Sequence, residues 1–129
     1  MSHEPKLINL RQVKDKRGDL SFSELSKDFP FEVKRVYWIS NAPENQERGG
    51  HAHKTDIQVI VCAQVKVKVK LLSLDKREMH FVLDTTTGAL LIPPMWWGEM
   101  LFQDNAVLIG FSSELFNEVD YIRNKSNFL

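Results

Sequence analysis

The sequence predicts an all-β fold of the jelly-roll or small β-barrel type, because two features of the chain point to strands. Apolar, β-branched and aromatic residues occur in many short runs, and turn-forming residues separate these runs at close intervals. In addition, no segment repeats its apolar residues at helical spacing over the length of an ordinary helix. Short helices are expected only at residues 21–28 and in the tail after Phe116.

The expected strands follow one another from residue 33 onward. They cover residues 33–39, 57–72, 79–83, 89–92, 97–102, 106–112 and 119–122. The clearest segment is 57–72, in which Val65, Val67 and Val69 alternate with lysines. Because successive side chains of a strand point to opposite faces, the valines should be buried and the lysines solvated. A solvated face is favoured over a row of phosphate-binding lysines.

The composition indicates one domain covering residues 1–129. Basic and acidic residues balance at 17 each, which argues against nucleic acid or a charged membrane surface as a partner. No apolar run approaches the ~20 residues of a membrane helix, and the first residues lack a secretory pattern, so we expect a soluble cytoplasmic protein. Cys62 is the only cysteine, which excludes an internal disulfide and a cysteine-rich zinc site.

Two of the four histidines have a spacing that suggests chemistry. His3 lies in the N-terminal tail and His80 on an expected strand, and both are expected to be structural or surface residues. His51 and His53 follow the glycine turn Gly49-Gly50 and stand two residues apart, so on a strand they share one face. Two imidazoles at the rim of a barrel can bind a metal or share proton transfer.

The H-x-H pattern after a glycine turn resembles the first motif of the cupin superfamily. Metal-binding cupins continue with a glutamate, whereas this chain has Ile57 and Gln58 there. Their second motif supplies another histidine, whereas this chain has Trp96 and Trp97. Because two imidazoles alone rarely hold a divalent ion tightly, we expect no metal and no other cofactor.

Four segments narrow the resemblance to the nucleotide-sugar 3,4-ketoisomerases. They are R-G-G-H-A-H-K at 48–54, R-V-Y-W-I at 35–39, P-M-W-W-G-E-M at 94–100, and D-Y-I-R at 120–123 with N-F-L at 127–129. The resemblance implies a cupin-type jelly roll and a metal-independent isomerase. Such an enzyme converts dTDP-4-keto-6-deoxyglucose into a dTDP-3-keto-6-deoxyhexose for deoxyamino-sugar biosynthesis.

The resemblance also implies catalytic roles. It makes His51 the principal acid/base, with His53 beside it and Tyr37 as a phenolic partner. Moving a carbonyl from C4 to C3 requires one proton to leave C3 and another to reach C4, and an imidazole suits such a shuttle at neutral pH. For Tyr37 a structural role at the rim, with its hydroxyl hydrogen-bonded, is an equal alternative.

A diphosphate substrate requires cations, and Arg17, Arg35 and Arg48 are the candidates, with ordinary surface positions as the alternative. Trp97 is expected to line the pocket and Trp96 to pack in the core or at the rim. Arg17 matches the family members with a galacto-configured product. Near the W-x-E-M region, family members with a galacto-configured product have a His, and those with a gluco-configured product have an Arg. This chain has Trp97 there, which matches neither.

The resemblance implies a homodimer in which N-terminal strands within residues 6–25 are exchanged or packed across subunits, which would cover sheet edges. One rival is a 3,5-epimerase-like cupin on the same substrate, which would need a His–Asp pair opposite a Tyr. No aspartate is assigned to His51, although Asp56 is not excluded. A nucleotide-sugar-binding cupin without activity and a metal-dependent cupin are the other rivals, the last disfavoured by its missing ligands.

Overall fold

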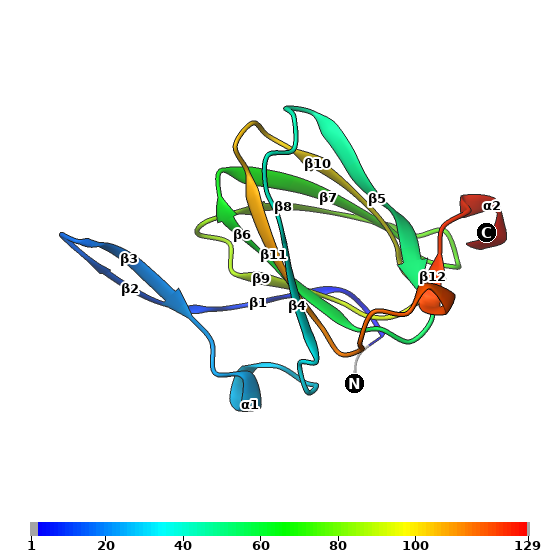
Figure 1. Cartoon of the computed structure of the whole chain (residues 1–129), viewed down its shortest axis with the longest axis horizontal. Coiled ribbons are helices and arrows are strands. Elements are labelled where there is room, and N and C mark those ends of the chain that lie inside the picture. The colour runs from blue at the N-terminus through cyan, green and yellow to red at the C-terminus, as the bar shows by residue number, and fades with distance from the viewer. Residues whose placement is uncertain (1–2, 129) are drawn as a thin grey trace.

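The computed structural model describes residues 3–128, and within them the chain is built mainly of β-strands (Figure 1). The strands are β1 (Lys6–Ile8), β2 (Arg11–Asp15), β3 (Gly18–Phe22), β4 (Arg35–Ile39), β5 (Gln46–His53), β6 (Gln58–Gln64), β7 (Lys66–Leu72), β8 (Glu78–Asp84), β9 (Ala89–Ile92), β10 (Trp97–Phe102), β11 (Val107–Ser112) and β12 (Tyr121–Ile122). The helices are α1 (Leu25–Asp28), α2 (Lys125–Phe128) and a 3₁₀ turn, Glu118–Asp120. None of these helices is long and apolar enough to cross a membrane.

Two five-stranded antiparallel sheets make up the body, in the orders β1-β9-β6-β11-β4 and β12-β5-β10-β7-β8. Apolar side chains from both sheets meet in one core, which includes Ile60 and Leu108 of the first sheet and Val67 and Phe102 of the second. This confirms the predicted all-β jelly roll. The expected helix at 21–28 is reduced to one turn, because the residues before it continue β3.

The predicted segment 57–72 contains two strands rather than one. Val65 has a φ of 66° and is 40% exposed, so it forms the turn between β6 and β7 instead of joining the buried face. Val67 and Val69 are buried as expected, and the lysines between them point the other way. The prediction that Val65 belongs to the buried row is therefore wrong, because the tight hairpin places it at the turn.

Strand β5 carries the H-x-H motif and depends on glycine. A Cβ on Gly49 would lie 2.8 Å from the carbonyl oxygen of Gly98 on β10, and the φ of Gly49 is 87°. The pairing of β5 with β10 shifts register between Gly98 and Glu99, which is a bulge in β5. Gly98, Met100 and Phe102 form the row of β10 that faces the core. Because of the bulge, His51 pairs with Gly98 and Arg48 pairs with Met100, so both lie opposite this row.

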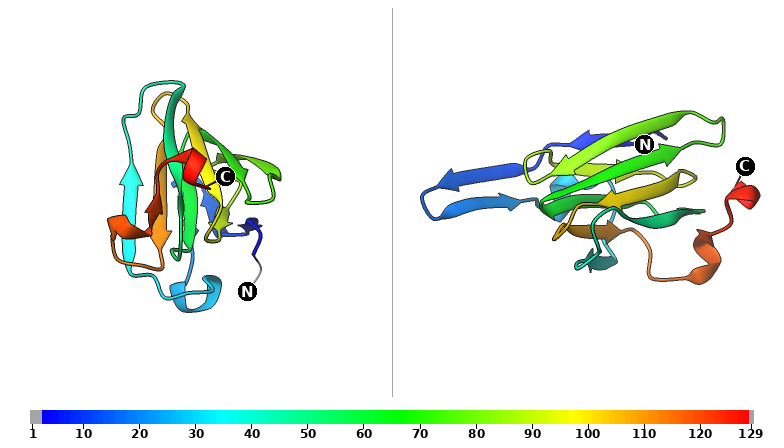
Figure 2. Two further views of the ribbon diagram at one scale, coloured as in Figure 1. Left: turned by 90° about the vertical axis from the view of Figure 1, so that its right-hand side faces the viewer. Right: turned by 90° about the horizontal axis from the view of Figure 1, so that it is seen from above.

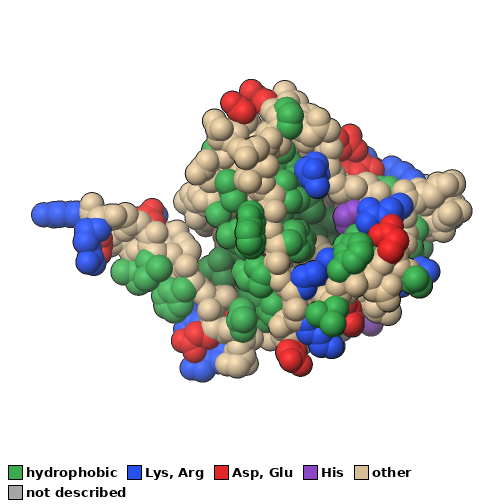
Figure 3. All heavy atoms as spheres, viewed as in Figure 1, with side chains coloured by type: hydrophobic (Ala, Val, Ile, Leu, Met, Phe, Trp, Pro, Cys, Tyr) green, Lys and Arg blue, Asp and Glu red, His purple; other side chains and the backbone are tan. Residues whose placement is uncertain are grey.

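The β2–β3 hairpin extends away from the two sheets, as Figures 1 and 2 show. Val13 and Leu20 on this hairpin are exposed, and so is Trp38 on the outer face of β4. The space-filling view shows hydrophobic side chains on the hairpin and across the middle of the body (Figure 3). A groove of about 620 Å³ separates the hairpin from the outer face of β6 and β11. These surfaces lie away from the two histidines on β5.

Candidate active site

Three aromatic rings cluster where the C-terminal end of β5 meets β12. His51 and His53 project from the same face of β5, and Tyr121 is the β12 residue that pairs with His53. The ring centroids are 4.9 Å apart for His51 and His53, 4.4 Å for His53 and Tyr121, and 5.1 Å for His51 and Tyr121. Both imidazoles can therefore contact one small molecule.

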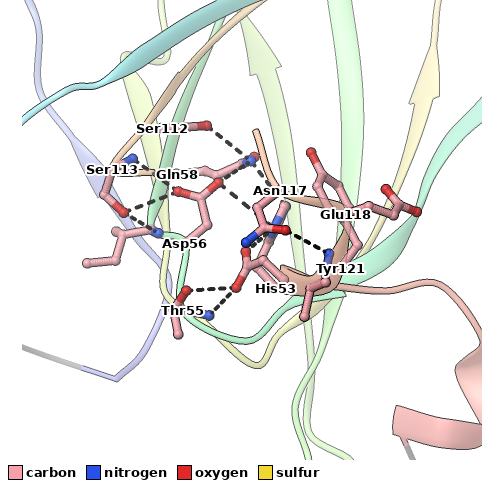
Figure 4. A network of polar contacts seen from close by, with 12 residues as sticks. His53, Thr55, Asp56, Gln58, Ser112, Ser113, Asn117, Glu118 and Tyr121 are labelled. Atoms are coloured by element: carbon pink, nitrogen blue, oxygen red, sulfur yellow. Dashed lines mark hydrogen bonds and ion pairs between the residues drawn. The ribbon is translucent and has the colours of Figure 1, made fainter. Parts of the chain in front are cut away.

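Both ring nitrogens of His53 have hydrogen-bond partners (Figure 4). Its Nδ1 lies 2.9 Å from Oδ2 of Asp120, and its Nε2 lies 3.1 Å from the side-chain nitrogen of Gln58. A carboxylate only accepts, so Nδ1 carries the proton and donates to Asp120, while Nε2 accepts from the amide of Gln58. His53 is 8% exposed, and these two contacts fix the orientation of its ring.

Asp120 is ionised although it is partly buried. Burial alone raises the pKa of this carboxyl, but hydrogen bonds from Thr55 and His53 outweigh that effect, so the pKa of Asp120 lies below its usual range. The hydroxyl and the backbone N–H of Thr55 each donate to Oδ1 of Asp120 at 2.7 Å. The second oxygen is therefore free to orient His53.

The amide of Gln58 connects His53 to Tyr37. The Tyr37 hydroxyl donates to Oε1 of Gln58 at 2.7 Å, and burial raises the pKa of this phenol. The Tyr37 ring lies across Gly110 of β11, where an added Cβ would come within 2.0 Å of the ring. Gly110 thus makes room for Tyr37, and the phenol remains protonated at neutral pH.

Arg35 forms an ion pair inside the same network. One of its terminal nitrogens lies 3.2 Å from Oδ2 of Asp56, and the other donates to the hydroxyl of Tyr121 at 3.4 Å. The other oxygen of the fully buried Asp56 accepts from the N–H and hydroxyl of Ser113. Arg35 therefore supports Asp56 and Tyr121 in this structure, rather than presenting a free fork to a phosphate.

His53, Asp56 and Asp120 bring one possible ligand atom each within 4.8 Å of one another, the only such metal-ligand group among residues 3–128. The guanidinium of Arg35 already neutralises Asp56, and Thr55 and His53 donate to Asp120. A cation here would have to compete with these donors. This donor set fits a proton-transfer site better than a metal site.

His51 differs from its neighbour. Within residues 3–128 its ring has no side-chain hydrogen bond, although its backbone contact with Gly49 favours the charged form slightly. Burial, followed by the proximity of His53, lowers the pKa of His51 to about 4. At neutral pH this imidazole is uncharged and able to accept a proton.

The structure brings His51, His53, Tyr37 and Arg35 together, and it places Arg48 on the same sheet face. Arg48 is exposed and pairs with Met100, which belongs to the core-facing row of β10. Its cationic end is therefore free to approach a ligand near His51.

Arg17 lies far from this cluster. It stands in the turn between β2 and β3, its side chain is 90% exposed, and it forms an ion pair with Asp15 at 2.7 Å. A hairpin that extends away from the body cannot bring Arg17 to the site of its own chain (Figure 2).

The expected position of Trp97 in the pocket is corrected by the structure. Trp97 is 4% exposed and packs with Ala52 and Phe128. Ala52 lies between the two histidines on β5 and so points to the opposite face of the sheet. Gly98, the next residue, occupies the row that pairs with His51, whereas Trp96 is in the core as expected.

Sequence reasoning did not assign roles to Asp120, Tyr121, Gln58 or Thr55. The D-Y-I-R segment supports the family resemblance without indicating a role for Asp120 or Tyr121. Gln58 stands where metal-binding cupins have a glutamate, which indicates only that this metal ligand is missing. Asp120 is 67 residues from His53 along the chain, and no local pattern connects them.

Comparisons with known proteins identify the family to which this chain belongs. A sequence model of the family described as "WxcM-like, C-terminal" (FdtA) matches residues 3–129. The TDP-4-oxo-6-deoxy-alpha-D-glucose-3,4-oxoisomerase of Aneurinibacillus thermoaerophilus is 36% identical over 126 residues, which is 97% of this chain and 90% of that protein.

Two solved structures are similar over nearly the whole chain. QdtA, a 3,4-ketoisomerase from Thermoanaerobacterium thermosaccharolyticum, solved as a mutant with TDP-4-keto-6-deoxyglucose, is 36% identical, with a TM-score of 0.91 and coverage of 99% of this chain and 93% of that one. WlaRB, a TDP-quinovose 3,4-ketoisomerase from Campylobacter jejuni, is 35% identical, with a TM-score of 0.87 and coverage of 96% and 95%. The chain therefore belongs to the WxcM-like, C-terminal (FdtA) family.

Proposed function

We propose that this protein is a 3,4-ketoisomerase of TDP-4-keto-6-deoxyglucose, in which His51 moves the proton between C3 and C4. The observation that carries the proposal is the difference between the two imidazoles. Both nitrogens of His53 are hydrogen-bonded, to Asp120 and Gln58, whereas His51 is neutral and makes no side-chain hydrogen bond within residues 3–128. The relative from Aneurinibacillus thermoaerophilus is named as a 3,4-oxoisomerase of this sugar nucleotide, and QdtA is a 3,4-ketoisomerase whose structure was solved in complex with it.

The proposed reaction conserves all atoms of the sugar. His51 takes the proton from C3, the C3–H electron pair forms a C3=C4 double bond, and the carbonyl oxygen on C4 takes up a proton to give an enediol. The hydroxyl on C3 then gives up its proton, which replaces the one that the oxygen on C4 took up, and C3 becomes the carbonyl while C4 receives a proton from the His51 imidazolium. No net oxidation occurs, so the residues of the site are sufficient for this balance.

Tyr37 and Arg48 have supporting roles in this proposal. Tyr37 is protonated and donates its proton to Gln58, so its hydroxyl oxygen remains able to accept a hydrogen bond from a sugar hydroxyl as a phenolic partner. Arg48 is the exposed cation on the face of His51 and is the candidate for the diphosphate.

We further propose a homodimer in which the β2–β3 hairpin packs on a second copy. Val13 and Leu20 on the hairpin, and Trp38 on the outer face of β4, are large exposed apolar side chains that such a contact would bury. Arg17 at the hairpin turn would then act in the partner's site. Only in this arrangement could Arg17 reach a bound sugar and favour the galacto-configured product that the resemblance implies.

A 3,5-epimerase is the second candidate, because the structure contains the His–Asp pair that this function requires. The pair is His53 and Asp120, and Tyr121 lies against it. Gln58, however, donates to the nitrogen of His53 that would have to accept a proton from the sugar. The isomerase is therefore the better supported of the two.

One experiment separates the candidates. The protein is incubated with TDP-4-keto-6-deoxyglucose in D₂O, and the sugar is followed by proton NMR. A new 3-ketone with deuterium at C4 supports the isomerase. Exchange at C3 and C5 with the 4-ketone retained supports the epimerase, and the absence of any exchange supports a binding protein without activity.

A further inference from the structure

The residues that orient His53 belong to the last part of the chain. Residues 113–128, here called the C-terminal segment, leave β11 in the first sheet and cross to the second, where β12 pairs with β5 (Figures 1 and 4). This segment brings Asp120 and Tyr121 to the histidines.

The contacts that hold the middle of this segment on β5 are short in sequence and mostly polar, and they centre on Asp120 and Tyr121. β12 pairs with β5 over only Tyr121–Ile122, and a strand of that length contributes little stability alone. The backbone carbonyl of Asp120 accepts from the N–H of Lys54 at 2.9 Å. The preceding residues Leu115, Phe116 and Val119 are exposed. A buried apolar contact elsewhere in the segment would therefore add to the polar contacts that Asp120 makes with His53 and Thr55.

Phe128 of α2 makes such a contact. Phe128 is 4% exposed and packs with Trp97 and Ala52, and Ile122 of β12 borders the same cluster. The ring centroids of Phe128 and Trp97 are 5.9 Å apart. We call these three residues, Ala52, Trp97 and Phe128, the Phe128 cluster.

A polar contact reinforces the same attachment. The indole N–H of Trp97 donates to Oε2 of Glu99 at 2.9 Å, and Lys125 of α2 reaches the same oxygen at 3.3 Å. Burial alone raises the pKa of Glu99, but these two donors outweigh it and keep the pKa below its usual range. Glu99 thus joins Trp97 of the sheet to α2.

The Phe128 cluster and the histidines lie on opposite faces of one strand. Ala52 is the residue between His51 and His53, and it pairs with Ile122, while His53 pairs with Tyr121. Any movement of α2 away from Trp97 would therefore pull β12 from β5 and carry Asp120 and Tyr121 away from the imidazoles.

We propose that Phe128 and Trp97 are positioning residues whose contact holds the C-terminal segment on β5 and thereby fixes Asp120 and Tyr121 against His53. The kinetic consequence rests on the proposed isomerase function, whereas the attachment itself does not. This assigns a role to Trp97 on the reverse side of the sheet from the site.

The attachment is measured without substrate, by amide hydrogen exchange. The N–H groups of Lys54 and Thr55 both donate to Asp120, so they report whether the segment is in place. Phe128→Ala should accelerate exchange of these two amides by roughly tenfold or more, and amides of the central strand β6 should be unchanged. Phe128→Leu, which keeps most of the apolar volume, should restore protection. Leu74→Ala, an exposed turn residue between β7 and β8, is the matched control.

Glu99→Gln provides a second variant in case Phe128→Ala does not fold. It removes the charge that holds Lys125 but leaves no cavity, and it should accelerate exchange of the same two amides to a smaller extent. Unchanged protection of the Lys54 and Thr55 amides in the folded variants would overturn the proposal.

Kinetics then test the consequence for catalysis. Phe128→Ala should lower kcat on TDP-4-keto-6-deoxyglucose about tenfold, with little change in KM, and should lower it little further when Asp120 is already Asn. Additive losses would contradict the proposed route through Asp120. If wild-type protein lacks the activity but the exchange results hold, the proposed function fails and the attachment stands.

Discussion

Gln58 donates its side-chain amide to Nε2 of His53 at 3.1 Å, and this contact makes the two neighbouring imidazoles chemically different. With Nδ1 already donating to Asp120, His53 has no ring nitrogen left for the sugar. His51, two residues earlier, is the imidazole that can exchange a proton.

The first prediction follows from this difference. His51→Asn keeps the size and one hydrogen-bonding edge but removes the titrating group, so turnover should fall by roughly 10²–10⁴. His53→Asn should cost less, because His53 contributes by orientation. Turnover and TDP affinity are measured for both variants at equal folded fraction. A larger loss in His53→Asn would reverse the two roles.

The second prediction concerns pH. Because the pKa of His51 is lowered from 6.5 to about 4, the unfolded chain binds a proton between these values that the folded protein does not. Stability should therefore fall as pH decreases from about 6.5 to 4, by a total on the order of 3 kcal/mol from this group.

Urea unfolding at several pH values checks this prediction, with His51→Asn as the comparison. The variant should show a smaller loss of stability between neutral pH and pH 4. In the wild type, kcat/KM should persist below pH 6, since the base stays neutral there. An acidic limb near 6.5 that disappears in the variant would show that His51 is not shifted.

The third prediction concerns Gly98, the β10 residue that pairs with His51. Its Cβ would lie 3.4 Å from Leu71 on the core-facing side, and its φ is not positive, so a side chain is tolerated by the backbone. Gly98→Val should fill space beside His51 and raise KM several-fold, and Gly98→Ala should do so less. Equal kinetics in the two variants, with unchanged thermal stability, would indicate that no substrate atom approaches this position.

The fourth prediction tests the proposed dimer and the role of Arg17. If Arg17 acts in the partner's site, Arg17→Ala and His51→Asn should each be nearly inactive alone. After mixing and subunit exchange, about half of the dimers are mixed and each has one intact site, so activity should recover to about a quarter of wild type.

The control for that experiment is a mixture of His51→Asn and Tyr37→Phe, whose altered residues belong to one site of one chain. Its mixed dimers should have no intact site. Sedimentation of the wild type as a monomer, or a lack of recovery in the Arg17 mixture, would contradict the shared site.

The fifth prediction is that chelators do not affect turnover. Arg35 neutralises Asp56 and Thr55 donates to Asp120, so the carboxylates beside His53 are already satisfied by protein donors. Activity should survive exhaustive chelation. Loss of activity that added Mn²⁺, Fe²⁺ or Zn²⁺ restores would show that the site holds a metal.

The sequence alone determined the fold class and the placement of the two histidines. Period-two alternation in residues 66–72 requires an extended strand, and the i, i+2 spacing of His51 and His53 requires a shared face on any strand. The resemblance in the H-A-H-K and D-Y-I-R segments identified the family, which the comparisons confirm.

Only the tertiary structure decided how these residues work together. Asp120 approaches His53 because the chain crosses between sheets, a long-range contact that no local spacing encodes. The bulge at Gly49-Gly50 and the pairing of β10 with β5 decided that Gly98, and not Trp97, faces the site. A shift of one residue exchanges the faces of a strand, so the side that each residue of β10 occupies depends on its partner strand as much as on its own sequence.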